Sequence, residues 1–282
     1  MENNEQANGD DVQMSFLQHL EELRWHLVRS AIAIMAVAIV AFLSKEFVFD
    51  SVIFAPKKEE FITFRALCWL SHKLHSILPA IVSNDAICIG KGIPELQNIS
   101  MAGQFATHII VSIIVGLIVA FPYVFWELWR FVRPALKNNE QKRTRGVVFS
   151  SSLLFMTGAV FGYFVIVPLS VNFLSTYSIS ESVKTIPTLS SYITTVTMIV
   201  LACGIIFELP LLVVFLTRGG LISPAFLKKF RRHAVVVSLI VSAIITPPDV
   251  FSQLLVSIPL LMLYEVSIWL SAVITKRAEK AA

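Results

Sequence analysis

Four long stretches of the chain contain no charged side chain, and they constrain the fold more than any other feature. They are residues 30–44, which Trp25–Leu27 can extend, 105–126, 147–167 and 185–207. A helix needs roughly 20 mostly apolar residues to cross about 30 Å of hydrocarbon. The stretches therefore predict four membrane-spanning helices. Only 15% of the residues are charged, against roughly 25% in soluble domains.

Two shorter apolar segments follow near the end of the chain, at residues 234–246 and 250–264. Pro247-Pro248-Asp249 separates them, and proline disfavours helical geometry in the residue before it. We predict a hairpin of two short helices that crosses the membrane; a re-entrant hairpin is the alternative. The expected fold is thus all-α, a polytopic membrane protein with six spans and short fifth and sixth helices.

Six spans place both ends of the chain on one side of the membrane, and charge indicates which side. Most of the 23 Lys and Arg residues fall in the segments on the side of the termini, and basic segments stay in the cytoplasm. Both termini are therefore predicted to be cytoplasmic. We expect a disordered acidic tail at 1–14, the six-helix domain at 15–275 and a basic tail at 276–282. Residues 45–104 then form an external loop.

The external loop contains Cys68 and Cys88. An oxidising exterior permits disulfides, so our hypothesis is that these two residues form one. Two buried thiols in a small helical cap are the alternative.

The sequence contains no motif typical of catalysis. It lacks Gly-x-Ser, His-Glu-x-x-His and a complete phosphate-binding loop. We therefore expect neither enzymatic activity nor a metal or cofactor. Its basic residues lie in short runs beside apolar stretches, which favours anionic lipids over nucleic acid as partners.

Glu208 interrupts the fourth apolar stretch, and Pro210 follows it. A carboxylate inside a span is costly and is usually functional or paired, and Pro210 can kink the helix. One interpretation is an ion-coupled secondary transporter that uses Glu208. A carboxylate hydrogen-bonded to a neighbouring helix is a purely structural alternative.

Acidic residues also lie beside the first and second apolar stretches. Phe16, Leu20, Leu23 and Leu27 share one face of a predicted helix, with Glu21, Glu22 and Arg24 toward its polar side. The segment 125–140 combines aromatic residues with Glu127 and Glu140. By spacing alone, an amphipathic lead-in and an interfacial aromatic collar explain both regions.

Several motifs, in order, resemble those of the TatC family, the core receptor subunit of the twin-arginine protein translocase. The resemblance covers about residues 16–268. The matching segments are His19-Leu20-Glu21-Glu22-Leu23-Arg24; Trp129-x-Phe131-x-x-Pro134-Ala135-Leu136 with Glu140; Ser150–Phe155 with Gly158, Phe161, Tyr163, Phe164 and Pro168; Phe207-Glu208-Leu209-Pro210; and Thr246-Pro247-Pro248-Asp249-Val250-Phe251-Ser252-Gln253. The long insertion around Cys68–Cys88, and Trp126-Glu127 where Tyr-Gln is common, depart from the family.

The resemblance implies a receptor for signal peptides that carry two adjacent arginines. Arginine presents a planar fork of donors that suits carboxylates, and Glu22 and Glu140 stand at the family's receptor positions. Arg24, Phe131, Pro134 and Leu136 belong to the same expected site, with Glu21 and Glu127 as helpers. Nearby arginines are expected to hold these acids in place.

The resemblance also implies partners and a setting. Glu208 and Pro210 would dock a single-span subunit of the TatA or TatB type, within a complex of several copies driven by the proton gradient in the cell inner membrane. At the external side we group Pro56, Pro248, Asp249 and Gln253, where Asp249 and Gln253 are expected first to support the hairpin. Gly158-x-x-x-Gly162 is expected to mark close packing of helices within this chain.

Overall fold

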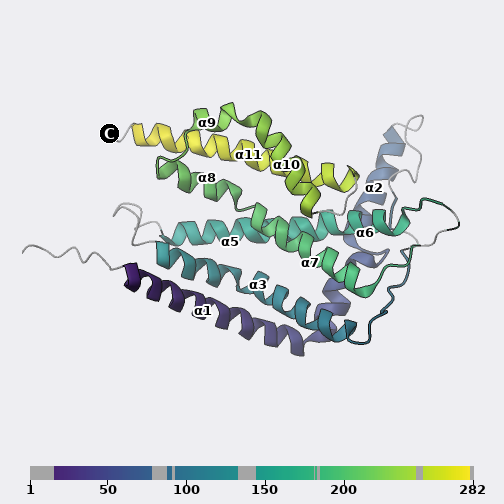
Figure 1. Ribbon diagram of the computed structural model, residues 1–282. Helices are drawn as coiled ribbons and strands as arrows, with labels where there is room; N and C mark the ends of the chain where they lie inside the picture. Colours follow the sequence, from purple (N-terminus) through teal and green to yellow (C-terminus); the bar gives the residue numbers. More distant parts are fainter. Residues whose placement is uncertain are drawn as a thin grey trace, which may run out of the picture.

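The computed structural model is built of helices that run side by side (Figure 1). It describes residues 16–77, 88–90, 93–132, 144–180, 182, 185–245 and 250–279. Within these ranges the only β-type pairing is an isolated bridge between Gln97 and Thr188. The predicted tail at 1–14 lies outside the described residues.

The first two spans are α1 (Phe16–Leu43) and α3 (Gly103–Val132), which pack closely along their length. Gly116 explains how closely they approach. A Cβ atom added there would lie 2.7 Å from the carbonyl oxygen of Ile34 and 3.0 Å from the Cβ of Ala38. Glycine at this point therefore allows the two backbones to meet.

The third span is continuous but changes its winding. It begins as α5 (Thr144–Phe161), passes through a π-helical turn at Gly162–Ile166 and ends as α6 (Val167–Thr176). Gly158 faces the fourth span, where an added Cβ would lie 2.5 Å from the carbonyl oxygen of Cys203. The Gly158-x-x-x-Gly162 motif thus packs helices within the chain, and that prediction is confirmed.

The fourth span is broken in its middle. The helix α7 (Leu189–Ile206) ends just before Glu208, and α8 (Leu209–Arg218) starts anew with Pro210 in its first turn. Proline has no amide hydrogen to give to the carbonyl four residues earlier, and its ring clashes with that carbonyl. The kink expected at Pro210 is therefore a full interruption of the helix.

The chain ends in α9 (Pro224–Lys229), α10 (Arg231–Ile245) and α11 (Val250–Glu279). The fifth span, α10, is short, as predicted. The sixth, α11, is longer than predicted, at 30 residues. Glu265 lies within this helix, where Nη2 of Arg231, at the start of α10, donates to its Oε2 at 2.6 Å. Both side chains are about half exposed, so the pair contributes little to stability.

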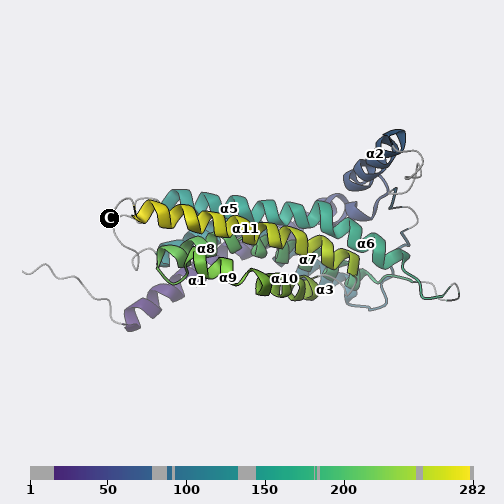
Figure 2. The same cartoon turned by 90° about the horizontal axis from the view of Figure 1, so that it is seen from above.

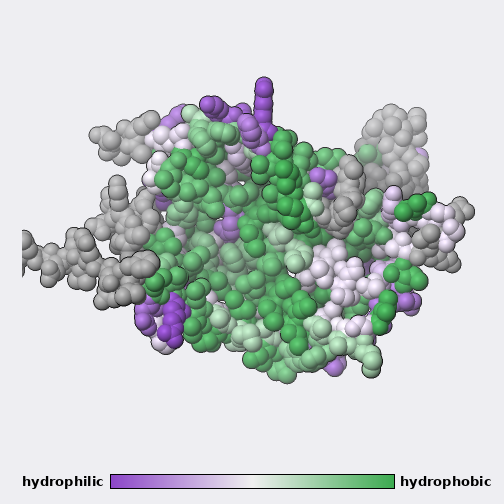
Figure 3. Space-filling view, viewed as in Figure 1, coloured by the Kyte–Doolittle hydropathy of each residue, from purple (hydrophilic) through white to green (hydrophobic). Residues whose placement is uncertain are grey.

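In the part of the chain that the structure describes, five helical segments are long and apolar enough to cross a membrane: Leu20–Leu43, Gly103–Val132, Gly146–Thr176, Leu189–Arg218 and Gln253–Lys276. The short α10 lies beside them as the sixth. Figures 1 and 2 show α1 beginning and α11 ending at the same end of the bundle, which we call the terminal end. Figure 3 shows that hydrophobic residues dominate the visible flank of the bundle.

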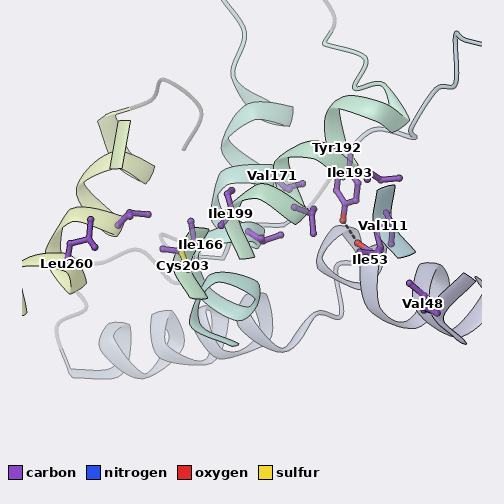
Figure 4. Packing of buried hydrophobic residues seen from close by; sticks show 14 residues of the cluster. Val48, Ile53, Val111, Ile166, Val171, Tyr192, Ile193, Ile199, Cys203 and Leu260 are labelled. Atoms are coloured by element: carbon purple, nitrogen blue, oxygen red, sulfur yellow. Dashed lines mark hydrogen bonds between the residues drawn. The ribbon is translucent and has the colours of Figure 1, made fainter. Parts of the chain in front are cut away.

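The opposite end, which we call the loop end, carries a π-helical segment η1 (Phe47–Ile53), a 3-10 turn η2 (Ala55–Lys57) and the helix α2 (Ile62–Ile77). Two tyrosine hydroxyls attach η1 to the spans. Tyr163 donates to the carbonyl of Val52 and Tyr192 to that of Ile53, both at 2.7 Å. Figure 4 shows the second bond within the buried cluster that includes Val111, Ile166 and Ile199.

Candidate functional site

The first turns of α1 bring three charged residues to the terminal end. Glu22 is exposed, and no ion pair found among the described residues involves it. Glu21 and Arg24 are also exposed and pair with each other, with Nη1 of Arg24 3.9 Å from Oε1 of Glu21. An exposed pair of this kind contributes little to stability. Glu22 is thus the acid of this segment that remains open to a ligand.

Glu127 lies in a different environment from the one expected of a surface acid. It is only 1% exposed, although it sits near the end of α3. Its Oε2 lies 2.5 Å from Nδ1 of His26 on α1, and Nη1 of Arg130 lies 3.7 Å from its Oε1. Glu127 therefore joins α1 to α3 and holds Arg130, and its carboxylate is closed to an incoming peptide.

The contact between His26 and α3 also sets the direction of Glu22. The rings of His26 and Phe131 meet edge to face, with centroids 6.2 Å apart. Residues four apart share a helix face, so Glu22 lies one turn before His26 on the face of α1 that meets α3. Arg24 and Phe131 lie at the same end of the bundle. Pro134, Leu136 and Glu140 fall outside the described residues.

Glu208 is partly exposed and lies well inside the fourth span, at the break between α7 and α8. Arg218, at the end of α8, is about three turns away, or about 15 Å along the helix. Ser151 of α5 donates its hydroxyl to Oε1 of Glu208 at 2.9 Å. The other oxygen, Oε2, is buried and has no hydrogen-bond partner among the described residues.

That oxygen belongs to a side chain that lines a cavity of about 300 Å³ between α3 and α8. The remaining lining is apolar or aromatic: Phe125, Leu128, Trp129, Val132, Leu211, Leu212, Phe215 and Leu216. Trp129 is buried, and its indole Nε1 is the second polar atom without a partner in the described part of the chain. Buried polar groups are rarely left unpaired, so this cavity suits a partner that brings a polar group into an apolar surface. Pro210 is buried in the first turn of α8, two residues after Glu208.

Of the residues grouped at the external side, the structure describes Pro56 and Gln253, which lie on different elements. Gln253 donates from Nε2 to the carbonyl of Leu239 at 3.1 Å, which ties α11 to α10. Pro56 does not belong to the α10–α11 hairpin. It lies buried in η2, which packs against α6. Pro248 and Asp249 fall outside the described residues. The contact of Gln253 agrees with a supporting role in the hairpin.

At the loop end, Cys68 and Cys88 form a disulfide with Cα atoms 4.3 Å apart. Nε2 of His72 lies 3.9 Å from each sulfur. This trio has the residue types of a metal site, but sulfurs bonded to each other are not thiolates, which are the form that binds metals. The arrangement is therefore that of a covalent link between α2 and the segment that follows it.

Sequence reasoning missed three residues of these sites: His26, Ser151 and the indole of Trp129. His26 follows Glu22 by four residues, which would have placed both on one helix face. Ser151 lies in the matched segment of the third span, but only the fold shows that it faces Glu208. No pattern in the sequence indicates that the Trp129 nitrogen lacks a partner.

Comparison with known proteins agrees with this architecture. The family model described as Sec-independent protein translocase protein (TatC) matches residues 18–259. The TatC protein of Blattabacterium sp. subsp. Periplaneta americana is 39% identical over 265 residues, which cover 94% of this chain and 97% of that protein. The TatC protein of Aquifex aeolicus is 33% identical over 95% of this chain and 98% of its own length.

A solved structure extends the likeness to three dimensions. It is the crystal structure described as the twin arginine translocase receptor TatC, with a TM-score of 0.68 and 33% identity. It covers 91% of this chain and 99% of its own chain. The chain therefore belongs to the TatC family of Sec-independent protein translocase components, which are multi-pass membrane proteins and not enzymes.

Proposed function

We propose that this chain is the receptor of a twin-arginine translocation system and binds the signal peptide of folded cargo at its terminal end. One observation carries the proposal: Glu22 is exposed on the face of α1 that the His26–Glu127 contact turns toward α3. The second proposed carboxylate, Glu140, follows α3 in the sequence. A pair of acids supplied by two segments suits a pair of adjacent arginines.

The chemistry of the ligand follows from the acids. Each guanidinium can give two parallel hydrogen bonds to one carboxylate, whereas a lysine ammonium acts as a point charge. Replacement of both arginines by lysine should therefore abolish binding. Arg24 and Phe131 lie beside this surface, and Pro134 and Leu136 complete the proposed site. Glu21 has a supporting role because Arg24 already pairs with it, and Glu127 acts from beneath the surface by holding His26 and Arg130.

The proposal gives Glu208 a second task, the docking of a single-span TatA- or TatB-type subunit. The cavity beside it lies between α3 and α8, and Glu208 is the one acid in its otherwise apolar lining, with a buried Oε2 that has no partner among the described residues. A helix from another subunit that carries one polar side chain would complete that hydrogen bond. Pro210 contributes by interrupting the helix beside Glu208.

The setting of this function is a cell inner membrane, with both termini in the cytoplasm and the arginine pair arriving from that side. Export is driven by the proton-motive force, within a hetero-oligomer of several copies and among anionic lipids. Family membership leaves the alternative of an ion-coupled transporter without support, since the family acts in protein translocation.

Site-specific crosslinking to a signal peptide tests the receptor role. Glu22→Gln and Glu140→Gln should each weaken crosslinking, and the double variant should reduce it to the level of a Lys-Lys peptide. Glu21→Gln is the matched control on the neighbouring residue and should retain most of the signal. Unchanged crosslinking in the double variant would refute the assignment.

A further inference from the structure

The helix α2 at the loop end carries large apolar side chains on its buried inner face and also on its exposed outer face. Phe64 and Ser71 lie on the inner face and are almost fully buried. On the opposite face, Ile62 and Trp69 are each 62% exposed and Leu70 is 41% exposed. A helix in water normally turns polar side chains outward. Large apolar side chains exposed together on one side of a helix are typical of contact with a membrane or another protein.

The start of α2 packs on the third span at Phe164, near the point where a hydrocarbon layer about 30 Å thick that begins at Gly146 would end. The hydroxyl of Thr63 donates to the carbonyl of Phe164, and the ring of Phe61 stacks on that of Phe164 with centroids 5.7 Å apart. Phe164 lies about five turns, or about 27 Å, along the third span from its start at Gly146. Since the hydrocarbon is about 30 Å thick, Phe164 is close to its outer edge.

The direction of α2 fits this depth. In Figures 1 and 2 the helix extends outward from the bundle and crosswise to the spanning helices. A helix that leaves the bundle sideways at the edge of the hydrocarbon runs over the membrane surface. Where α2 meets the third span, Phe164 is itself 37% exposed.

The charges of α2 favour phospholipid over protein as the occupant of this face. The helix contains no acidic residue, whereas Arg65 and Lys73 are both exposed. Nζ of Lys73 lies 4.9 Å from the centre of the Trp69 ring. Tryptophan beside a long basic side chain is typical of the membrane interface, where the ring enters the headgroup region and the cation meets phosphate.

We propose that α2 is an interfacial helix that lies on the phospholipid surface at the loop end. Its Ile62, Trp69 and Leu70 enter the boundary between headgroups and acyl chains, and Arg65 and Lys73 contact lipid phosphates. The disulfide between Cys68 and Cys88 then fastens the following segment to a helix that rests on the membrane. This role does not depend on recognition of a signal peptide, so each can fail without the other.

Photo-crosslinking in vesicles of phosphatidylethanolamine and phosphatidylglycerol tests the proposal. A benzophenone amino acid replaces Trp69 in the full chain, and the matched control carries it in place of the exposed Glu60, just before α2. We expect phospholipid adducts by mass spectrometry at position 69, several-fold more abundant than at position 60. Adducts to a second copy of the chain instead of lipid, or equal lipid adducts at both positions, would overturn the proposal.

A second measurement avoids the loss of Trp69. The variants Ile62→Cys and Glu60→Cys are labelled with the fluorophore NBD under non-reducing conditions, which leaves the disulfide intact. Phospholipids with a doxyl quencher near the headgroup should quench the label at 62 several-fold more than the label at 60. A label at 62 that is shielded from water but not quenched by lipid would place a protein surface there and contradict the proposal.

Discussion

Nδ1 of His26 and Oε2 of Glu127 lie 2.5 Å apart and join α1 to α3 one turn from the exposed Glu22. Because Glu127 is buried, this contact is shielded from solvent in a way that the exposed pair of Glu21 and Arg24 is not. Glu127, which departs from the family's common pattern, thus joins two helices. It fixes the segment that presents Glu22.

Replacement of Glu127 by leucine should therefore destabilise the protein. The change leaves the partly buried ring of His26 without its hydrogen-bond partner, and an unsatisfied polar group of this kind costs about 1–3 kcal/mol. We expect the thermal unfolding midpoint in detergent to fall by several degrees. Glu127→Gln keeps a hydrogen-bonding group and should lose less, and Glu21→Leu should change the midpoint little. An equal loss for Glu21→Leu and Glu127→Leu would contradict this account.

Glu208→Ala should abolish transport while signal-peptide crosslinking remains. The variant removes the one acid of the cavity between α3 and α8 but leaves the terminal end of α1 unchanged. Transport assays in membrane vesicles and crosslinking on the same preparation separate the two effects. Ser151→Ala serves as the control, because it removes the hydrogen bond to Oε1 without removing the acid. If Glu208→Ala transported cargo normally, the docking role would be lost.

Gly158→Leu should disturb the packing between the third and fourth spans. A Cβ at this position would already lie 2.5 Å from the carbonyl oxygen of Cys203 and 2.7 Å from the Cβ of Phe207, the residue before Glu208. Overpacking of this kind costs about 1–3 kcal/mol and should lower the unfolding midpoint. Gly146→Leu is the matched control, since nothing lies within 4 Å of an added Cβ there. Similar midpoints for the two variants would show that the spans separate easily.

Thiol labelling should report one reactive cysteine in the unfolded chain before reduction and three afterwards. Cys68 and Cys88 are bonded to each other, and Cys203 is a free thiol buried in the core. Mass spectrometry after denaturation, with and without reductant, gives the count. Three labels without reductant would place the two loop cysteines in the reduced state.

The helical fold could be predicted from the sequence because uncharged stretches of about 20 residues have few other uses. The short α10 and the break at Pro210 also followed from local rules, since helix length and the missing proline amide are visible in the chain. The length of α11 was not predicted, because the prediction ended the sixth span at Glu265. A charge limits the part of a helix that lies in hydrocarbon, but glutamate is a good helix former and does not end the helix itself.

The candidate sites were predictable only in part. Glu22 and Glu208 were found from motifs, but the burial of Glu127 was not. Whether an acid near the end of a helix faces water or a neighbouring helix depends on packing, and here the decisive neighbour, His26, is about 100 residues away in the chain. Pro56 is likewise buried in η2, which packs against α6. That position depends on how the whole loop folds, which no local pattern indicates.

The disulfide between Cys68 and Cys88 has a consequence for proteolysis. It closes the intervening chain into a covalent ring, so one cut of the peptide backbone within that ring does not separate the two parts of the protein. A protease that cuts only within this ring would leave a nicked chain that keeps its full mass on a non-reducing gel. Two fragments would separate only after reductant is added, and the insertion that carries α2 would remain attached until then.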